Sequence, residues 1–268
     1  MKDESIDRRD FLIKTGMVAG AFTLGGYVGG MRVLASVESK SNLAQGPSVS
    51  YAPPPLKTDV RFAMALNTKA CVGCRRCVYA CVKTNNIPRS SNMEWIRVQS
   101  LKRGTISLKN TDSLYTKAPL PDRWYLPVAC MQCESPPCVK VCPVTATWKD
   151  PDGITVIDYD KCIGCRYCVV ACPYGARRFN WKKPEVPEGE LNLEVPKRPV
   201  GVAEKCTFCI HRVRIGRTPA CVEACPTAAR FFGDMNDPES AVSKLIITRR
   251  AFRLKEEQGA DPRFYYLG

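Results

Sequence analysis

The segment CIGCRYCVVACP, residues 162–173, decides the fold of this chain. Its four cysteines are separated by two, two and three residues, and a proline follows the last. Three similar groups lie elsewhere in the chain, and together the groups use all sixteen cysteines. They are Cys71, Cys74, Cys77 and Cys81; Cys130, Cys133, Cys138 and Cys142; Cys162, Cys165, Cys168 and Cys172; and Cys206, Cys209, Cys221 and Cys225.

Groups one and three have the spacing Cys-x2-Cys-x2-Cys-x3-Cys with which bacterial ferredoxins bind [4Fe–4S] clusters, and in groups two, three and four a proline follows the last cysteine. A cubane cluster needs four thiolates that converge on one small object. Two-residue spacers fold successive sulfurs and backbone N–H groups around one corner of it, whereas the three-residue spacer starts a helix and directs the fourth sulfur elsewhere. The sequence therefore predicts four [4Fe–4S] clusters, with iron bound through the same sixteen cysteines.

Two other uses of cysteine fit the pattern less well. Disulfide frameworks of this cysteine density occur in chains shorter than about 100 residues, and they rarely repeat one spacing with a trailing proline. Zinc sites need two Cys-x2-4-Cys pairs, which leaves the third cysteine of a Cys-x2-Cys-x2-Cys run without a role.

The net charge of +14 is typical of nucleic-acid-binding proteins, but it counts cysteine as neutral. An oxidised [4Fe–4S] core with four thiolates carries −2, so four clusters reduce the +13 of residues 36–268 to about +5. Many basic residues flank the cysteines, where they are expected to offset cluster charge and raise reduction potentials. They are Arg75, Arg76, Lys140, Arg166, Arg177, Arg178, Lys205 and Arg212. A solvated basic face is the alternative for any one of them.

The N-terminus resembles a twin-arginine (Tat) export signal, with Arg8-Arg9 followed by Phe11-Leu12. A glycine-rich apolar stretch ends at Val33-Leu34-Ala35, after which cleavage is expected. We expect residues 1–35 to be the signal peptide, residues 36–60 a flexible leader, and the protein to be periplasmic. An accidental arginine pair is one alternative, and an uncleaved signal that serves as an anchor is the other, although its glycines favour a helix poorly.

The second and third cysteine groups predict a two-cluster ferredoxin unit at residues 129–181. Residues 143–148 and 154–158 alternate in polarity around a turn at Asp152-Gly153, which predicts a β-hairpin. A short helix is expected over Ile163 to Ala171, and a return strand over Arg177 to Trp181.

The first and fourth groups predict an outer ferredoxin-like unit that the inner one interrupts, comprising residues 61–128 and 182–268. Arg61 to Leu66 is its opening strand, and Cys71 to Lys83 supplies a motif and a helix. The eleven residues between Cys209 and Cys221 are expected to form an inserted loop. The fold class is therefore α+β, with two ferredoxin-like units, one inserted within the other.

Two-cluster ferredoxins exchange their fourth ligands, so that the last cysteine of each run binds the other cluster. The alternative, four local sites, is sterically awkward for the three-residue spacer. The exchange predicts cluster 1 on Cys71, Cys74, Cys77 and Cys225; cluster 2 on Cys206, Cys209, Cys221 and Cys81; cluster 3 on Cys130, Cys133, Cys138 and Cys172; and cluster 4 on Cys162, Cys165, Cys168 and Cys142.

From Arg61 onward the chain resembles the four-cluster iron–sulfur subunits of the molybdopterin oxidoreductase (DMSO reductase) superfamily. The resemblance rests on KACVGC (69–74), CESPPC (133–138), DKCIGC (160–165), KCTFCIHR (205–212) and FGDMNDP (232–238). It is strongest to the exported subunits of tetrathionate, thiosulfate and polysulfide reductases.

This resemblance implies an electron-transfer subunit in anaerobic respiration, with a catalytic partner at the Cys71/Cys225 end and a membrane quinone partner at the inner pair. Since all sixteen cysteines are present, the [3Fe–4S] variant of some relatives is not expected. A related complex without a molybdopterin partner, serving nitrite or sulfite reduction, is the alternative.

No catalytic constellation accompanies the cysteines. The single histidine, His211, is expected at the surface or at an interface, and a role in tuning the nearby cluster is the alternative. We therefore expect no substrate site, which argues against a self-standing oxidoreductase; a zinc- or disulfide-stabilised binding protein is the third hypothesis. The polar tail from Ala251 to Gly268 predicts no C-terminal membrane anchor, so membrane attachment would be peripheral and through a partner.

Overall fold

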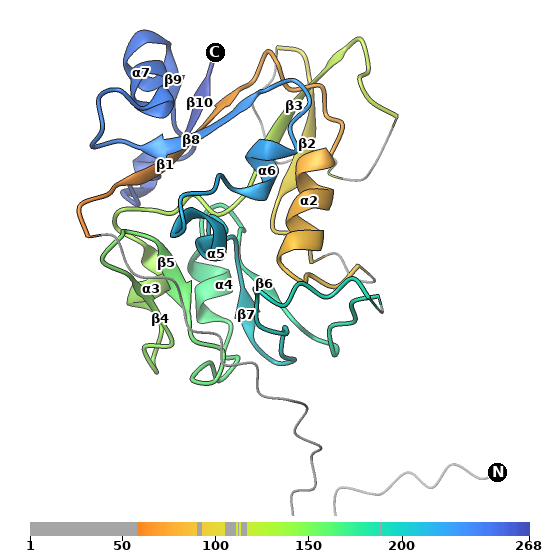
Figure 1. Cartoon of the computed structure of the whole chain (residues 1–268), viewed down its shortest axis with the longest axis vertical. Coiled ribbons are helices and arrows are strands. Elements are labelled where there is room, and N and C mark those ends of the chain that lie inside the picture. The colour runs from red at the N-terminus through yellow and green to blue at the C-terminus, as the bar shows by residue number, and fades with distance from the viewer. Residues whose placement is uncertain (1–57, 90–92, 105–110, 112, 114–116, 188) are drawn as a thin grey trace, which may run out of the picture. The chain divides into compact units, whose positions relative to one another are not determined.

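The computed structural model of the chain describes residues 58–89, 93–104, 111, 113, 117–187 and 189–268 (Figure 1). The expected signal peptide and almost all of the expected leader lie outside these residues. Among the described residues, no helix is long and apolar enough to cross a bilayer.

A four-stranded sheet of order β8-β1-β10-β9 forms the upper part of the view in Figure 1. Its strands are β8 (Arg230–Asp234), β1 (Phe62–Asn67), β10 (Phe264–Leu267) and β9 (Ala251–Phe252). β1 pairs antiparallel with β8 and parallel with β10, so strands from both ends of the described chain share one sheet. The expected opening strand at residues 61–66 is confirmed as β1.

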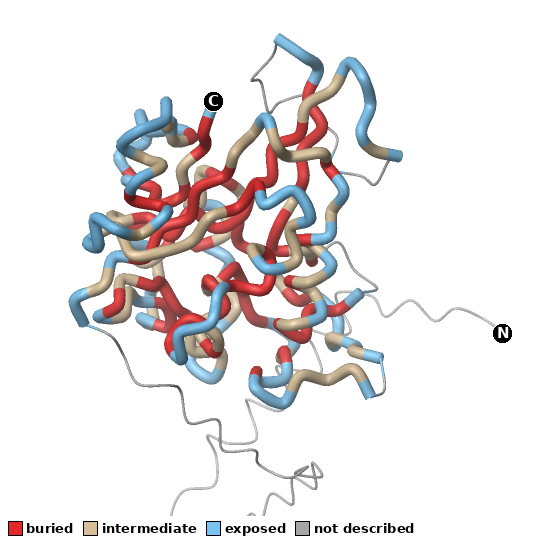
Figure 2. The backbone as a smooth tube through the Cα atoms, turned by 45° about the horizontal axis from the view of Figure 1, so that its top comes forward, coloured by how far each residue is buried: buried red, intermediate tan, exposed pale blue. Residues whose placement is uncertain are grey.

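Both faces of β1 are buried, each by different residues. Phe62, Met64 and Leu66 enter the main hydrophobic core. Ala63 and Ala65 face the other way, toward Val242 of α7 (Ala241–Thr248). Alternate side chains point to opposite faces of a strand, and the small alanines let the helix pack closely. Figure 2 shows this burial running along the central strands.

The C-terminal segment, expected to be polar throughout, contains the apolar and buried strand β10. Phe264 and Tyr266 are fully buried in the main core, because β10 lies between β1 and β9 in the sheet. The charged residues precede the strand, around the short 3-10 helix η1 (Glu256–Gln258). A polar average over this stretch conceals an apolar strand of only four residues.

The expected hairpin is confirmed as β4 (Thr147–Lys149) and β5 (Thr155–Ile157), paired antiparallel. The expected return strand contains β6 (Arg178–Phe179), which pairs with β7 (Ala203–Glu204). β2 (Arg97–Lys102) pairs antiparallel with β3 (Arg123–Val128) in a sheet of two strands.

The helices next to the cysteines are short. They are α2 (Arg76–Thr84), α3 (Pro137–Lys140), α4 (Tyr167–Ala171), α5 (Ile210–Val213) and α6 (Ala220–Glu223). The helix expected over residues 163–171 begins only at Tyr167, because Gly164 and Arg166 before it have positive φ angles that a right-handed helix cannot contain. The loop expected between Cys209 and Cys221 instead begins with α5.

Candidate metal centres

All sixteen cysteines lie within the described residues, and none forms a disulfide. The structure gathers three sets of four around three cavities, which enclose similar volumes of about 330 to 350 Å³, open mouths included. Site 1 is lined by Cys71, Cys74, Cys77 and Cys225; site 3 by Cys130, Cys133, Cys138 and Cys172; and site 4 by Cys142, Cys162, Cys165 and Cys168. Each cavity thus combines three cysteines of one group with the fourth of another.

The remaining four cysteines also come together, and we call them site 2. Cys81 lies close enough to Cys206, Cys209 and Cys221 for their charges to act on it. The side-chain amide of Asn85 bridges the set, with Nδ2 at 3.7 Å from the Sγ atoms of both Cys81 and Cys209. In all four sites, therefore, the fourth cysteine of a run lies with the first three cysteines of a different run.

One backbone feature recurs in every group. The residue before the second cysteine has a positive φ: 73° at Gly73, 46° at Gln132, 70° at Gly164 and 54° at Phe208. This conformation turns the chain sharply between the first two cysteines, so that both sulfurs face the same side. The repeat of spacing in the sequence is thus a repeat of backbone conformation.

The turn after the fourth cysteine also recurs. The third residue beyond it has a positive φ at Thr145, Gly175 and Ala228. In two of these turns a backbone N–H then donates to the cysteine sulfur, from Ala176 to Cys172 at 3.4 Å and from Ala229 to Cys225 at 3.3 Å. Hydrogen bonds of this kind favour the thiolate form.

Burial raises the pKa of seven of these thiols and so makes them poorer acids on their own. It raises the pKa of Cys71 to about 11 and that of Cys221 to about 12, and it raises the pKa of Cys81 well above its ordinary value. At Cys225 burial is outweighed by the hydroxyl of Thr227 and by backbone N–H groups, and the pKa is lowered. A coordinated thiol is deprotonated outright, because the metal supplies the missing positive charge.

The four sites fit [4Fe–4S] clusters on this chemistry. Each brings four cysteines together, around a cavity in sites 1, 3 and 4, with N–H groups or cationic side chains nearby. No three described His, Cys, Asp or Glu side chains gather as tightly as a single metal ion requires. The guanidinium Nε of Arg177, buried beside sites 3 and 4, has no hydrogen-bond partner among the described residues.

The basic residues that flank the cysteines divide into two kinds. Arg177 and Lys205 are almost fully buried, at 2% and 1% exposure. Arg76, Lys140 and Arg166 are exposed, and Arg212 pairs with Glu223. The sequence interpretation missed Arg230, which is buried with Nη2 at 3.6 Å from the Cys77 sulfur. Its signal is the repeat Cys-Pro-x-x-Ala-Arg, which occurs at residues 172–177 and 225–230.

The expectation of a surface position for His211 is wrong. His211 is the second residue of α5 and is only 5% exposed. This burial lowers its pKa to about 4. The ring is therefore neutral at physiological pH, and it belongs to the packing of α5 beside site 2.

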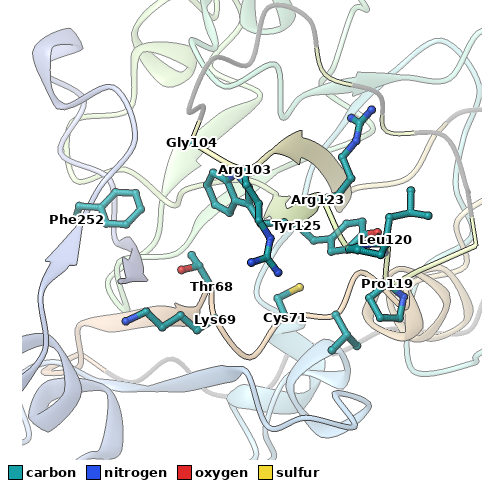
Figure 3. Close-up of a pocket in the computed structure, with 13 residues that line it drawn as sticks. Thr68, Lys69, Cys71, Arg103, Gly104, Pro119, Leu120, Arg123, Tyr125 and Phe252 are labelled. Carbon is teal, nitrogen blue, oxygen red and sulfur yellow. Dashed lines mark hydrogen bonds between the residues drawn. The ribbon is translucent and has the colours of Figure 1, made fainter.

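A larger cavity opens beside site 1, with Cys71 in its wall (Figure 3). Its lining combines basic residues, Lys69, Arg103 and Arg123, with the aromatic rings of Trp124, Tyr125 and Phe252. In Figure 3 the Arg103 side chain extends toward Cys71. A partner seated in this cavity would reach a cysteine of site 1 directly.

The surroundings of site 4 include several exposed apolar side chains. Large apolar side chains are exposed on α3, α4 and the adjoining segments: Val141, Ile163, Tyr167, Val170 and Trp181. Ile163 also lines the site 4 cavity, and Val170 is 86% exposed. Contiguous exposed apolar residues mark interaction surfaces.

Sites of this kind on short ferredoxin-like elements define an iron–sulfur electron-transfer protein. Two family models described as 4Fe-4S dicluster domain match the chain, at residues 122–235 and 70–147. The first spans cysteine groups two to four, and the second spans groups one and two.

Comparison with known relatives identifies the family to which this chain belongs. The chain is 43% identical to the menaquinone reductase iron–sulfur cluster-binding subunit of Nitratidesulfovibrio vulgaris, over 78% of this chain and 89% of the relative. It is 38% identical to a selenate reductase subunit of Mesobacillus selenatarsenatis, over 98% of each. It is 36% identical to a tetrathionate reductase subunit of Salmonella typhimurium, over 78% of this chain and 72% of the relative. The chain belongs to the iron–sulfur subunits of the molybdopterin oxidoreductase superfamily.

Proposed function

We propose that this chain carries four [4Fe–4S] clusters and relays electrons between a molybdopterin-type catalytic subunit and a membrane quinone or quinol subunit. The clusters supply one-electron chemistry. The protein's residues hold them at fixed positions and set their potentials. The ligand sets are those of sites 1 to 4, each with one cysteine exchanged between runs.

The observation that carries this proposal is the grouping of the cysteines. Cys142 lines the cavity of Cys162, Cys165 and Cys168, whereas Cys172 lines that of Cys130, Cys133 and Cys138. Local ligation would instead require Cys142 to lie with its own run. The grouping therefore favours exchange.

Neighbouring sites adjoin, which supports a relay along the chain of sites. Cys77 of site 1 lies near Cys221 of site 2. Cys206 of site 2 lies near Cys130 of site 3, and Cys138 of site 3 lies near Cys168 of site 4. These proximities order the sites 1, 2, 3, 4.

We also propose the nested organisation, with an inner unit at residues 129–181 and an outer unit at residues 61–128 and 182–268. The pairing of β1 with β8 supports it, because these strands lie on either side of the inner unit in the sequence. The hairpin β4–β5 supports it as well, since the inner unit closes that sheet by itself.

The two ends of the relay suit different partners. The basic and aromatic cavity at Cys71 suits docking of the catalytic subunit near site 1. The exposed apolar residues around α4 suit docking of a polytopic membrane subunit near site 4. Relatives named as menaquinone and tetrathionate reductase subunits support partners of these classes. We propose no nucleic-acid partner and no small-molecule substrate bound by this chain alone.

Export completes the proposal. Residues 1–35 are proposed as a twin-arginine signal and residues 36–60 as a leader, so that the folded protein acts in the periplasm, attached to the membrane through its partner. The signal and almost all of the leader lie outside the described residues.

Cluster content and cysteine variants test the proposal. Anaerobically prepared protein is expected to contain sixteen iron and sixteen sulfide per chain, because sixteen cysteines bind four clusters. Cys142→Ser is expected to alter the same paramagnetic resonance signal as Cys162→Ser and to leave the signal of Cys130→Ser intact. Eight iron or fewer after full reconstitution, or a Cys142→Ser variant that matches Cys130→Ser, would contradict it.

A further inference from the structure

Six lysine and arginine residues are buried among the described residues: Arg177, Arg198, Lys205, Arg214, Arg230 and Arg263. An isolated buried charge is unfavourable by several kcal/mol, so each is expected to have a counter-charge. The identity of that counter-charge separates the six into two classes.

Three of them face carboxylates. Arg198 lies 3.9 Å from Glu204, Arg214 binds both Asp150 and Asp152, and Arg263 lies 3.7 Å from Glu134. These pairs join loops and strands of the fold. Arg198 and Arg263 also lie near a cysteine, Cys209 and Cys130 respectively, but each has a carboxylate partner. The carboxylates of Glu204, Asp150, Asp152 and Glu134 therefore supply the counter-charges of these three arginines.

The other three, Arg177, Lys205 and Arg230, have no ion pair with any described carboxylate. Each of them faces cysteines. The buried cations without an acidic partner are therefore the ones beside the proposed cluster sites.

Arg177 lies between sites 3 and 4, because it lines both cavities. Its Nη2 donates to the Cys138 sulfur at 3.1 Å and to the Thr147 hydroxyl at 2.8 Å. Burial opposes its charge, but the thiolates of Cys138 and Cys168, one from each site, outweigh burial and raise the pKa of Arg177.

Arg230 holds the same position between sites 1 and 2. It lines the site 1 cavity, and its Nη2 lies 3.6 Å from the Cys77 sulfur. Burial again opposes the charge, and Cys77 and Cys221, one from each site, raise its pKa. Arg177 and Arg230 each follow a fourth cysteine by five residues, so the two positions are equivalent in the repeat.

Lys205 fills the remaining gap, between sites 2 and 3. Its ammonium group donates to the carbonyl of Cys206 at 3.0 Å, in site 2. It also donates to the carbonyl of Thr155, which lines the site 3 cavity. Lys205 is only 1% exposed, so solvent screens its charge little.

We propose that Arg230, Lys205 and Arg177 form a row of buried cations, one in each gap between successive clusters, and that each raises the reduction potentials of both clusters beside it. This inference rests on the proposed function, because it takes sites 1 to 4 as cluster sites. A reduced cluster carries one more negative charge than an oxidised one, so a nearby cation stabilises the reduced form.

The placement predicts a pattern that needs no assignment of signals to clusters. In the complex purified from membranes, each of Arg230→Met, Lys205→Met and Arg177→Met is expected to shift two of the four cluster signals to lower potential in a redox titration followed by paramagnetic resonance. The Arg230 and Lys205 variants share one shifted signal, the Lys205 and Arg177 variants share one, and the Arg230 and Arg177 variants share none. We expect each reduction equilibrium to fall at least tenfold, about 59 mV for one electron.

A matched control separates buried from exposed charge. Lys140 follows Cys138 by two residues but is exposed. Lys140→Met removes the same charge near the same cysteine, and solvent screening is expected to leave all four potentials unchanged. A shift in Lys140→Met as large as that in Arg177→Met would overturn the role of burial.

Charge-retaining variants decide cases in which a methionine variant loses iron. Arg177→Lys, Arg230→Lys and Lys205→Arg are expected to retain sixteen iron and near-wild-type potentials. Three outcomes would overturn the row. The first is a lower reduction potential in the charge-retaining variants, and the second is a methionine variant that shifts one signal or none. The third is a shifted signal that the Arg230 and Arg177 variants share. Eight iron or fewer in the fully reconstituted wild-type chain would overturn the ligand sets and the row with them, whereas sixteen iron without the pattern would overturn the row alone.

Discussion

Positive φ angles before the second cysteine give every group the same turn, although only two groups have glycine there. Gly73 and Gly164 adopt this conformation readily. Gln132 is held in it by hydrogen bonds, since its amide donates to the Cys206 carbonyl at 2.7 Å and accepts from the Thr155 N–H at 2.9 Å. The same two bonds tie site 2 to site 3, so the strained residue also joins neighbouring sites.

Gly73→Ala tests how much the turn matters to cluster binding. The backbone φ is +73°, and an added Cβ would lie 2.5 Å from the ring of Tyr125. We expect the variant to lose the site 1 cluster, about four iron per chain, measured by iron and sulfide analysis after reconstitution. Gly259→Ala is the control, because Gly259 also has a positive φ but has open space around it. Equal iron in both variants would show that the close approach to Tyr125 does not matter.

The grouping of the cysteines could be predicted from the sequence, because the ligand exchange of two-cluster ferredoxins indicates which sulfurs lie together. The buried cations could not be separated from the exposed ones in the same way. Arg177 and Lys140 are both basic and both near cysteines, and only the fold buries one and exposes the other. Arg230 was missed because it follows Cys225 across a turn that the sequence interpretation did not align with the turn after Cys172.

At the scale of elements, the sheet joins the two ends of the described chain. β10 pairs parallel with β1, with Met64 opposite Phe264 and Leu66 opposite Tyr266. This pairing cannot be predicted from the local sequence pattern, because the paired residues are about two hundred residues apart and β10 has only four residues. The hairpin β4–β5 could be predicted from the sequence, because its two strands and the turn between them are adjacent in the chain.

Phe264→Ala is expected to weaken this sheet. The ring is 1% exposed and packs against Tyr266, with ring centroids 5.1 Å apart. Truncation of a buried phenylalanine lowers the free energy of unfolding by about 3–5 kcal/mol. Because cluster loss makes unfolding irreversible, the measurement is the rate at which visible absorbance bleaches in urea. Ile247→Ala, at an 80% exposed position on α7, is expected to bleach at the wild-type rate. Equal rates would place Phe264 outside the stabilising core.

At the scale of the whole molecule, the arginine pair at residues 8 and 9 offers a test of the proposed export. Arg8→Lys with Arg9→Lys preserves charge but removes the arginine pair that a receptor reads. We expect cluster-loaded precursor to accumulate in the cytoplasm, detected by fractionation and immunoblotting. Lys2→Arg, which also preserves charge and leaves the pair intact, is the control. Normal periplasmic levels of the double variant would refute a twin-arginine signal.

The side chains around site 1 differ from those around site 4, and this difference indicates which partner docks at each end of the proposed relay. Site 1 opens to a cavity with basic and aromatic walls. Site 4 is surrounded by exposed apolar side chains on and near α4. Because apolar surface that stays in water is unfavourable, the second end is the one expected to be covered permanently.

Val170→Asp tests that end of the molecule. Val170 is 86% exposed, so the substitution leaves the core intact and places a charge among the exposed apolar residues near site 4. A charge buried at an interface without a partner is strongly unfavourable, so we expect the chain to leave the membrane complex and appear in the soluble fraction. Its iron content should stay at the wild-type value, since no ligand is changed.

The matched control is Ile247→Asp, which introduces the same charge at an 80% exposed apolar position on α7, an element that packs on the four-stranded sheet and not on α4. It is expected to remain bound to the membrane. Fractionation, native electrophoresis and iron analysis of both variants distinguish the outcomes. Release of both variants would mean that added charge alone disrupts the complex, and retention of both would remove the α4 surface from the proposed membrane interface. Release of Val170→Asp alone, with its clusters intact, would place the membrane subunit against site 4 and thereby set the end of the relay that exchanges electrons with quinone.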